Sequence, residues 1–208
     1  MSDKNKTSLA TVVDTVQPSA SSNAPAAQPP KLSVVVPTFN EYSNLAEVVR
    51  RLGETLRGIK WEVVFVDDDS TDGTPQALRD IAQSDARVRY LHRIGRRGLA
   101  SAVVEGILST SASFVAVMDA DLQHDETRLI AMLDRLRHSD CDVVVGSRYL
   151  EAGGVEGWDE RRQTISRVAT SLAHLLLKTE LSDPMSGFFM LRRDAFVRSV
   201  RRLSRIGY

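Results

Sequence analysis

Short apolar runs alternate with segments of helical period from Leu32 onward, and this alternation restricts the possible folds more than any other feature of the chain. The runs are LSVVV (32–36), WEVVFV (61–66), VRYL (88–91), FVAVM (114–118) and DVVV (142–145). Because they are apolar throughout, they suit strands that are buried on both faces, as in a parallel sheet. Apolar residues recur at helical spacing within 129–136 and 165–176. We therefore predict an α/β fold with a doubly wound, mostly parallel central sheet and helices on both faces.

The first residues of the chain have a different composition. The segment Gln17–Lys31 holds four of the seven prolines and almost no large apolar side chain. Such a segment cannot bury enough apolar surface to offset the entropy of ordering. We predict a disordered tail at residues 1–31, followed by one domain at 32–208.

Composition limits the partners and the compartment. Lysine plus arginine and aspartate plus glutamate each number 27, so no net positive charge favours nucleic acid. A single cysteine, Cys141, fits a reducing compartment. The sequence contains neither the apolar core of a signal peptide nor a run of about 18 apolar residues that could span a bilayer. We expect a cytoplasmic protein that is soluble or peripheral on a membrane.

Polar residues follow most of the predicted strands. PTFNE follows the first strand, DDDSTDGT the second, Asp119 and Asp121 the fourth, and Gly146-Ser-Arg148 the fifth. Ligands of open α/β sheets bind beyond the carboxyl ends of the strands, so these residues are expected at one rim. An edge with acids and an arginine suits a metal-bridged nucleotide diphosphate.

Asp119 and Asp121 stand one residue apart, with Gln123 two residues further on. Carboxylates this close repel each other unless they are protonated, spread into water or bridged by a cation. Two carboxylates and an amide oxygen form a hard, incomplete shell for Mg²⁺ or Mn²⁺. His124 is expected to pack or cap rather than to bind the metal.

The residues of the acidic segment 67–74 are expected to have different roles. Asp68 is placed to accept hydrogen bonds from a base or a ribose. Residues 70–73 are expected in a turn or a helix cap. Thr74 and Pro75 predict an N-cap followed by proline at the first helical position.

PTFNE, DDDSTDGT, MDADLQH and VVGSRY, in this order, resemble the inverting glycosyltransferases of family 2, which have the GT-A fold. GGVEGW (153–158) and DPMSGF (183–188) make the chain most similar to the dolichol-phosphate (polyprenyl-phosphate) mannose synthases of that family. The resemblance covers residues 32–208. It also implies that the chain lacks the C-terminal part of such enzymes.

The resemblance implies roles for individual residues. Nucleotide binding is implied for Pro37, Phe39, Glu41, Val66, Asp68, Ala120, Arg148 and Arg162. Metal binding is implied for Asp119, Asp121 and Gln123, and catalysis for Asp119, Asp121 and Arg148. Phe39 stands where the family has tyrosine, and Arg161 is a second candidate beside Arg162 for the lipid phosphate.

The implied reaction moves mannose from GDP-mannose to a polyprenyl phosphate with inversion, giving a polyprenyl β-mannosyl phosphate at the cytoplasmic face of a membrane. A phosphate monoester has a second pKa of about 6, so the acceptor is already largely dianionic at neutral pH. We therefore expect no general base.

Three alternatives remain open. The first is transfer of glucose from UDP-glucose to undecaprenyl phosphate. The second is a haloacid-dehalogenase-like phosphohydrolase, because Asp67-x-Asp69-x-Thr71 matches the nucleophile motif of that class. The third is a nucleotide-sugar-binding fragment without activity. The basic segment 192–205 is either an amphipathic helix on an anionic membrane or a surface helix packed on the sheet.

Overall fold

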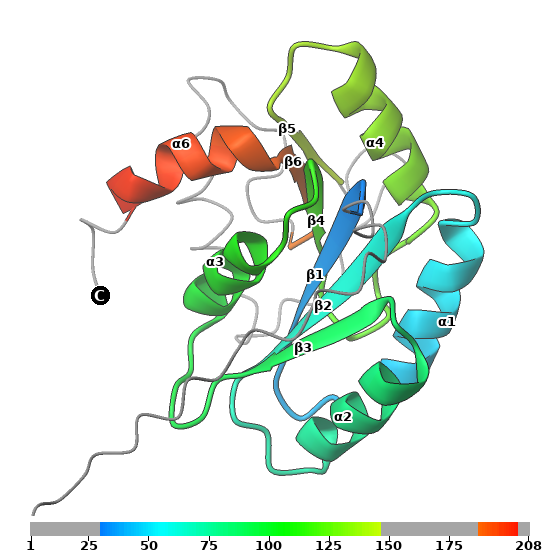
Figure 1. Ribbon diagram of the computed structural model, residues 1–208, viewed down its shortest axis with the longest axis vertical. Helices are drawn as coiled ribbons and strands as arrows, with labels where there is room; N and C mark the ends of the chain where they lie inside the picture. The colour runs from blue at the N-terminus through cyan, green and yellow to red at the C-terminus, as the bar shows by residue number, and fades with distance from the viewer. Residues whose placement is uncertain (1–29, 147–186, 204–208) are drawn as a thin grey trace, which may run out of the picture.

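The computed structural model describes residues 30–146 and 187–203, the last three by their backbone alone. The chain runs through β1 (Leu32–Thr38), α1 (Leu45–Thr55), β2 (Trp61–Asp67), α2 (Thr74–Ser84), β3 (Val88–His92), α3 (Leu99–Ser109), β4 (Phe114–Val117), α4 (Arg128–His138), β5 (Val143–Val145), β6 (Phe189–Arg192) and α6 (Arg193–Leu203) (Figure 1). The predicted helix at 165–176 lies outside the described residues, and the division at residue 31 stays a prediction.

The strands form one sheet in the order β3-β2-β1-β4-β6-β5. β1 pairs in parallel with β2 and β4, and β2 pairs in parallel with β3. β6 runs antiparallel to β4 and β5, so β5 keeps the direction of the parallel strands. The mostly parallel sheet is confirmed. β6 has no counterpart among the predicted strands.

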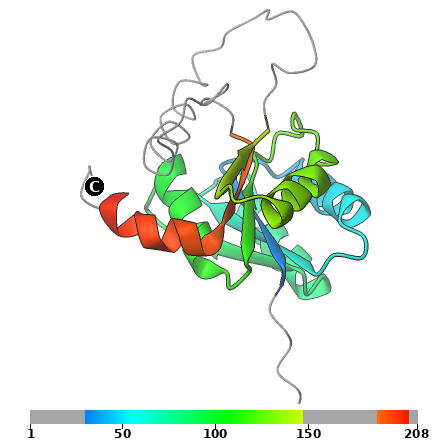
Figure 2. The ribbon, with the colours of Figure 1, turned by 90° about the horizontal axis from the view of Figure 1, so that it is seen from above.

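Helices cover both faces of the sheet, as predicted (Figure 2). Val34 and Val36 point to the face covered by α1, α2 and α4, whereas Val35 points to the face covered by α3 and α6. All three valines are fully buried. Successive side chains of a strand alternate between faces, so an unbroken valine run indicates a strand with no solvent face.

α6 packs on the sheet through its apolar stripe. Phe196 is fully buried in the same cluster as Val35, and Val200 packs against that cluster. Of the two interpretations of the segment 192–205, the structure therefore favours the packed surface helix. Across residues 30–146 and 187–203, no helix is long and apolar enough to cross a membrane.

α3 approaches the sheet so closely that Gly106 has no room for a side chain. A Cβ atom there would clash with the Val35 side chain and would lie 3.0 Å from Val66 Cγ2. α3 begins directly after the loop that joins it to β3, at the edge where β1 and β2 end.

We expect Gly106→Ala to lower the free energy of unfolding by about 1–3 kcal/mol, the usual cost of overpacking a core. Gly53→Ala is the matched control, because a Cβ atom at Gly53 would meet its nearest neighbour at 3.7 Å, an ordinary contact. The control should be neutral or stabilising, since alanine favours a helix over glycine by about 1 kcal/mol. Urea denaturation of both variants measures the difference. Equal effects would contradict the close packing of α3.

Candidate active site

The predicted site residues of the described part lie where β1, β2 and β4 end (the lower edge of the sheet in Figure 1). Pro37, Phe39 and Glu41 come from β1 and its loop, Val66 and Asp68 from β2 and its loop, and Asp119, Ala120, Asp121 and Gln123 from the loop after β4. Arg148 and Arg162 lie outside the described residues, as do Arg161 and the segments 153–158 and 183–186. We call this edge the carboxylate edge.

Each of the three loops contains one non-glycine residue with positive φ: Asn40 at 58°, Asp69 at 59° and Leu122 at 62°. This left-handed conformation is uncommon for side chains other than Asn and Asp, and Leu122 is therefore strained. Strained backbone is concentrated at functional sites, where the surrounding structure holds it in place.

The loops after β1 and β2 hold each other. The Asn40 N–H donates to Ser70 Oγ at 2.8 Å, and the Thr71 N–H donates to Asn40 Oδ1 at 2.9 Å. The Glu41 N–H donates to the hydroxyl of Thr74 at 3.1 Å. These bonds fix the position of Glu41.

Thr74 was predicted as the N-cap of α2, and the structure corrects this by one residue. Thr74 is the first helical residue and Gly73, with a φ of 94°, is the N-cap. The carboxylate of Asp72 accepts the Thr74 N–H at 3.1 Å. The hydroxyl of Thr74 donates to the same carboxylate at 2.6 Å and accepts the N–H of Glu41, so Asp72 also positions the group that anchors Glu41.

Three carboxylates, Glu41, Asp119 and Asp121, act on one another at this edge. Burial raises the pKa of Glu41 above its ordinary value, and the charges of Asp121 and Asp119 raise it further, while a hydrogen bond from Asn44 opposes the shift. Among the described residues, no lysine or arginine forms an ion pair with any of the three.

The loop after β4 presents its two carboxylates differently. Asp119 lies 3.4 Å from Nε2 of His124, whose ring stacks on Phe188 with centroids 5.1 Å apart. Asp121 is exposed and accepts the N–H of Gln123 at 3.0 Å. His124 thus packs, as expected. Within the described ranges, no group of three His, Cys, Asp or Glu side chains converges as a complete metal shell.

Asp68 holds the loop between β3 and α3. One of its oxygens accepts from Arg93 Nη1 at 2.5 Å, and the other accepts the Gly98 N–H at 2.6 Å. Arg93 is 3% exposed and also donates to the Gly98 carbonyl and to the hydroxyl of Ser101. The sequence analysis did not identify Arg93. Its only signal is its position directly after a strand that ends at this edge.

The loop held by Asp68 forms one wall of a pocket of about 250 Å³. The pocket is lined by Pro37, Thr38, Phe39, Asp68, Arg97, Gly98 and Leu99. The guanidinium of Arg97 lies 4.3 Å from the centroid of the Phe39 ring. Val66 and Ala120, by contrast, are buried in the core beneath the edge.

Asp67 is unsuited to act as a nucleophile. Its carboxylate is fully buried and accepts hydrogen bonds from Ser70 and Thr38. A phosphohydrolase would have to present this carboxylate to its substrate. The structure therefore argues against the haloacid-dehalogenase-like alternative.

Residues 33–199 match glycosyl transferase family 2. The chain is 37% identical over 166 residues to the dolichol-phosphate mannosyltransferase of Pyrococcus furiosus, covering 79% of this chain and 47% of that protein. It is 35% identical over 165 residues to the dolichol-phosphate mannosyltransferase of Saccharomyces cerevisiae, covering 77% of this chain and 60% of that protein. The chain thus spans about half the length of the curated relatives that it matches.

Solved structures share the fold. The mannosyltransferase PcManGT from Pyrobaculum calidifontis, in complex with GDP-Man and Mn²⁺, superposes with a TM-score of 0.56 at 22% identity, over 88% of this chain and 50% of that chain. Glucosyl-3-phosphoglycerate synthase from Mycobacterium tuberculosis superposes with a TM-score of 0.55 at 21% identity, over 79% of this chain and 58% of that chain. The predicted GT-A fold is confirmed.

We expect Arg93→Met to lower the free energy of unfolding by about 3–5 kcal/mol, because it leaves the Asp68 carboxylate buried without its partner. The double variant Arg93→Met/Asp68→Leu should cost less than the sum of the single variants, since it removes both charges. Arg50→Met, which breaks an exposed pair with Glu47, is the control and should change little. Additive effects in the cycle would contradict the buried pair.

Glu41→Gln should stabilise the metal-free protein at neutral pH. The pKa of Glu41 is raised in the folded state, so ionising this carboxyl costs more there than in the unfolded chain. The stability that protonated Glu41 retains at acid pH is lost as the pH rises through its folded pKa. The variant should therefore resist urea better than wild type at about pH 7–8, and its advantage should vanish below the ordinary glutamate value of 4.5. A pH-independent difference measured in EDTA would contradict this account.

Proposed function

Because the chain belongs to glycosyl transferase family 2, we propose that it transfers mannose from GDP-mannose to a polyprenyl (dolichyl-type) phosphate. The two relatives named as dolichol-phosphate mannosyltransferases support this donor and acceptor. The single observation that carries the proposal is the carboxylate edge, where Glu41, Asp119 and Asp121 interact beside a pocket of about 250 Å³.

A divalent cation, Mg²⁺ or Mn²⁺, fits the donor atoms of this edge. Asp119 and Asp121 offer carboxylate oxygens and Gln123 an amide oxygen, which are the ligands that hard cations prefer. The charges of Asp121 and Asp119 help to raise the pKa of Glu41, and a bound cation would relieve such crowding of negative charge. When bound, the metal would act as a Lewis acid that stabilises the departing diphosphate.

The nucleotide would occupy the pocket at the end of β1 and β2. Phe39 and Arg97 supply a ring and a stacked guanidinium, and Asp68 holds the loop that forms the wall. Pro37 lines the same pocket, whereas Val66 and Ala120 would support it from beneath. We assign Arg148 and Arg162 to the phosphates of donor and acceptor, as the family resemblance implies.

The reaction needs no proton transfer to the enzyme. An acceptor phosphate oxygen forms a bond to the anomeric carbon while the bond from that carbon to the GDP oxygen breaks, and GDP leaves with the electron pair. The acceptor is a dianion at neutral pH, since its second pKa is about 6. Attack from the face opposite to GDP inverts the configuration. The protein must therefore bring the anionic acceptor phosphate and the anionic GDP-mannose together, by charge-assisted contacts.

A polyprenyl phosphate resides in a membrane, so the carboxylate edge would have to face a lipid surface. We propose a peripheral position on the cytoplasmic face. The domain at 32–208 would then act as the catalytic unit.

Calorimetric titration with GDP tests the proposed function. We expect GDP binding to require Mg²⁺ or Mn²⁺, and Asp121→Ala to weaken it at least about a hundredfold, because even supporting residues of metal sites are worth up to about that much. Asp134→Ala removes an exposed carboxylate of α4 that pairs with Arg137, and should leave binding unchanged. Equal binding without metal would refute the metal site.

Transfer assays with polyprenyl phosphate then compare two donors. We expect product from GDP-mannose. A preference for UDP-glucose would replace mannose by the alternative sugar, and nucleotide binding without transfer to any acceptor would favour the non-catalytic alternative.

A further inference from the structure

Four large apolar side chains are exposed in the described part of the chain, and three of them lie at the carboxylate edge. Phe39 is 43% exposed and Tyr42 59%, in the loop after β1, and Ile94 is 74% exposed, in the loop after β3. The fourth, Leu108, lies near the end of α3, at the opposite edge, where the strands begin. Isolated exposed apolar side chains are common, but several at one edge indicate a surface that contacts another molecule.

Ile94 stands at the tip of a tight turn between β3 and α3. The Arg96 N–H donates to the Arg93 carbonyl at 3.0 Å, which closes the turn. Ile94 and Gly95 are its two central residues, and Gly95 has a φ of 67°, a conformation that glycine adopts without strain. This loop lies below α3 at the lower edge of the molecule in Figure 1. The turn therefore holds the Ile94 side chain out into solvent.

The turn is tied to its surroundings on two sides. The Gly95 N–H donates to the carboxylate of Asp69 at 3.1 Å, and Arg96 pairs with Glu105 of α3 at 2.9 Å. Ile94 is thus presented by a preformed turn, so little further conformational entropy is lost when it docks.

The surface around Ile94 carries no net positive charge. Arg96 is balanced by Glu105. Arg97 forms no ion pair with a carboxylate of the described residues and stacks on Phe39, but the exposed carboxylate of Asp69 offsets its charge in the same region. Attraction of a partner to this surface must therefore come from apolar contact rather than from charge.

We propose that Ile94 inserts into the headgroup region of a phospholipid bilayer, with Tyr42 as a second contact, and so sets the carboxylate edge against the membrane. Apolar side chains and tyrosine both favour this region. Phe39 lines the nucleotide pocket, so Ile94 and Tyr42 carry the contact. The proposal rests on the proposed function, which requires a lipid acceptor to reach this edge.

The backbone of the turn is suited to such a position. The N–H groups of Gly95 and Arg96 are both hydrogen-bonded, so neither loses a partner when the turn leaves water. One isoleucine supplies only a weak, reversible contact. An acceptor lipid bound at the same edge would strengthen the contact, because two linked interactions reinforce each other.

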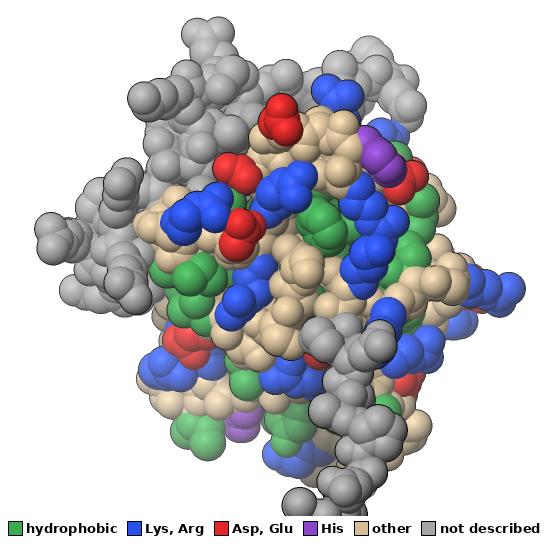
Figure 3. Space-filling model, turned by 45° about the horizontal axis from the view of Figure 1, so that its top comes forward, with side chains coloured by type: hydrophobic (Ala, Val, Ile, Leu, Met, Phe, Trp, Pro, Cys, Tyr) green, Lys and Arg blue, Asp and Glu red, His purple; other side chains and the backbone are tan. Residues whose placement is uncertain are grey.

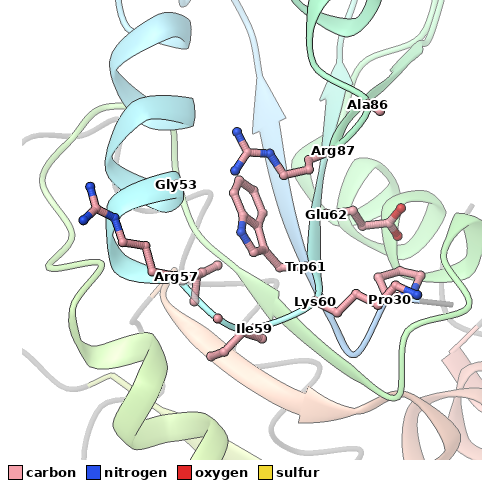
Figure 4. Close-up of a pocket in the computed structure, with 11 residues that line it drawn as sticks. Pro30, Gly53, Arg57, Ile59, Lys60, Trp61, Glu62, Ala86 and Arg87 are labelled. Carbon is pink, nitrogen blue, oxygen red and sulfur yellow. The ribbon is translucent and has the colours of Figure 1, made fainter. Parts of the chain in front are cut away.

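The opposite end of the strands offers charge instead. Figure 3, with the amino ends of the strands turned forward, shows Lys and Arg side chains spread over that face. A pocket of about 580 Å³ opens there, and Figure 4 shows Arg57 and Lys60 on opposite sides of Trp61 with their charged ends pointing apart. These cations do not converge on one lipid phosphate. A face of this kind still attracts an anionic bilayer, so the test of Ile94 uses neutral lipid.

The fluorescence of an Ile94→Trp variant tests the insertion directly. The chain has two tryptophans, so the background is Trp158→Phe, with Trp61, 6% exposed at the far end of β2, as a constant baseline. With phosphatidylcholine vesicles we expect the added emission to shift to shorter wavelength, and brominated phosphatidylcholine to quench it, because the indole moves from water into the bilayer interface. Leu108→Trp is the matched control and should show neither effect. An Ile94→Trp signal that vesicles leave unchanged would overturn the proposal.

Sedimentation with phosphatidylcholine vesicles measures the contribution of the native side chain. We expect Ile94→Ser to weaken vesicle binding by about tenfold, through loss of one apolar contact, and Ile94→Leu to retain it. Leu108→Ser removes an exposed apolar side chain from the opposite edge and should leave binding unchanged. Equal losses in Ile94→Ser and Leu108→Ser would overturn the proposal. Binding confined to anionic vesicles and unaffected by Ile94→Ser would do so as well, since it would assign the membrane contact to the basic face of Figure 3.

Asp121→Ala separates this inference from the proposed function. That substitution should abolish metal-dependent GDP binding and leave vesicle binding intact, whereas Ile94→Ser should leave GDP binding intact. If GDP does not bind but the Ile94→Trp emission is quenched, the proposed function fails and the membrane contact stands. If GDP binds and the Ile94→Trp emission is not quenched, the membrane contact alone is wrong.

Discussion

β1 is hydrogen-bonded along both of its sides and covered on both of its faces, and the position of the candidate site follows from this. Parallel pairing with β2 and β4 gives the three strands one direction, so the loops that follow them emerge together. The strand itself lies in the core: Val34, Val35 and Val36 are fully excluded from solvent. Polar residues that stand far apart in the sequence therefore lie at one edge of the sheet. The pairing of the strands, rather than contacts among these polar residues, brings them together.

The carboxylates at this edge fall into two groups that differ in how their charge is balanced. Asp67 and Asp68 are buried and receive hydrogen bonds or an ion pair from Ser70 and Arg93. Burial without such partners would cost several kcal/mol, on the order of a whole domain's net stability. Asp119 and Asp121 form no ion pair with a lysine or arginine of the described segments. The first group builds the scaffold, and the second is available to a ligand.

Most strands of the sheet could be predicted from the sequence, because a strand that is buried on both faces consists of an unbroken apolar run. The run predicted at 32–36 and the strand observed at Leu32–Thr38 differ only at one end. β6 was missed, because its antiparallel pairing with β4 depends on where the chain returns after residue 186 rather than on local pattern. Arg93 was missed for a similar reason: its role arises from a carboxylate 25 positions earlier, at the end of a neighbouring strand.

The antiparallel strand has a consequence for how such proteins diversify. Val145 at the end of β5 is paired with Phe189 at the start of β6, and the Gly146 N–H donates to the Phe188 carbonyl at 2.8 Å. The chain therefore leaves and re-enters the sheet at adjacent points on a single rim. Because both ends of the segment 147–186 are fixed by strand pairing, its length or sequence can change during evolution while every described strand keeps its hydrogen-bonded neighbours. Changes between these two points would therefore leave the pairing of the described strands intact.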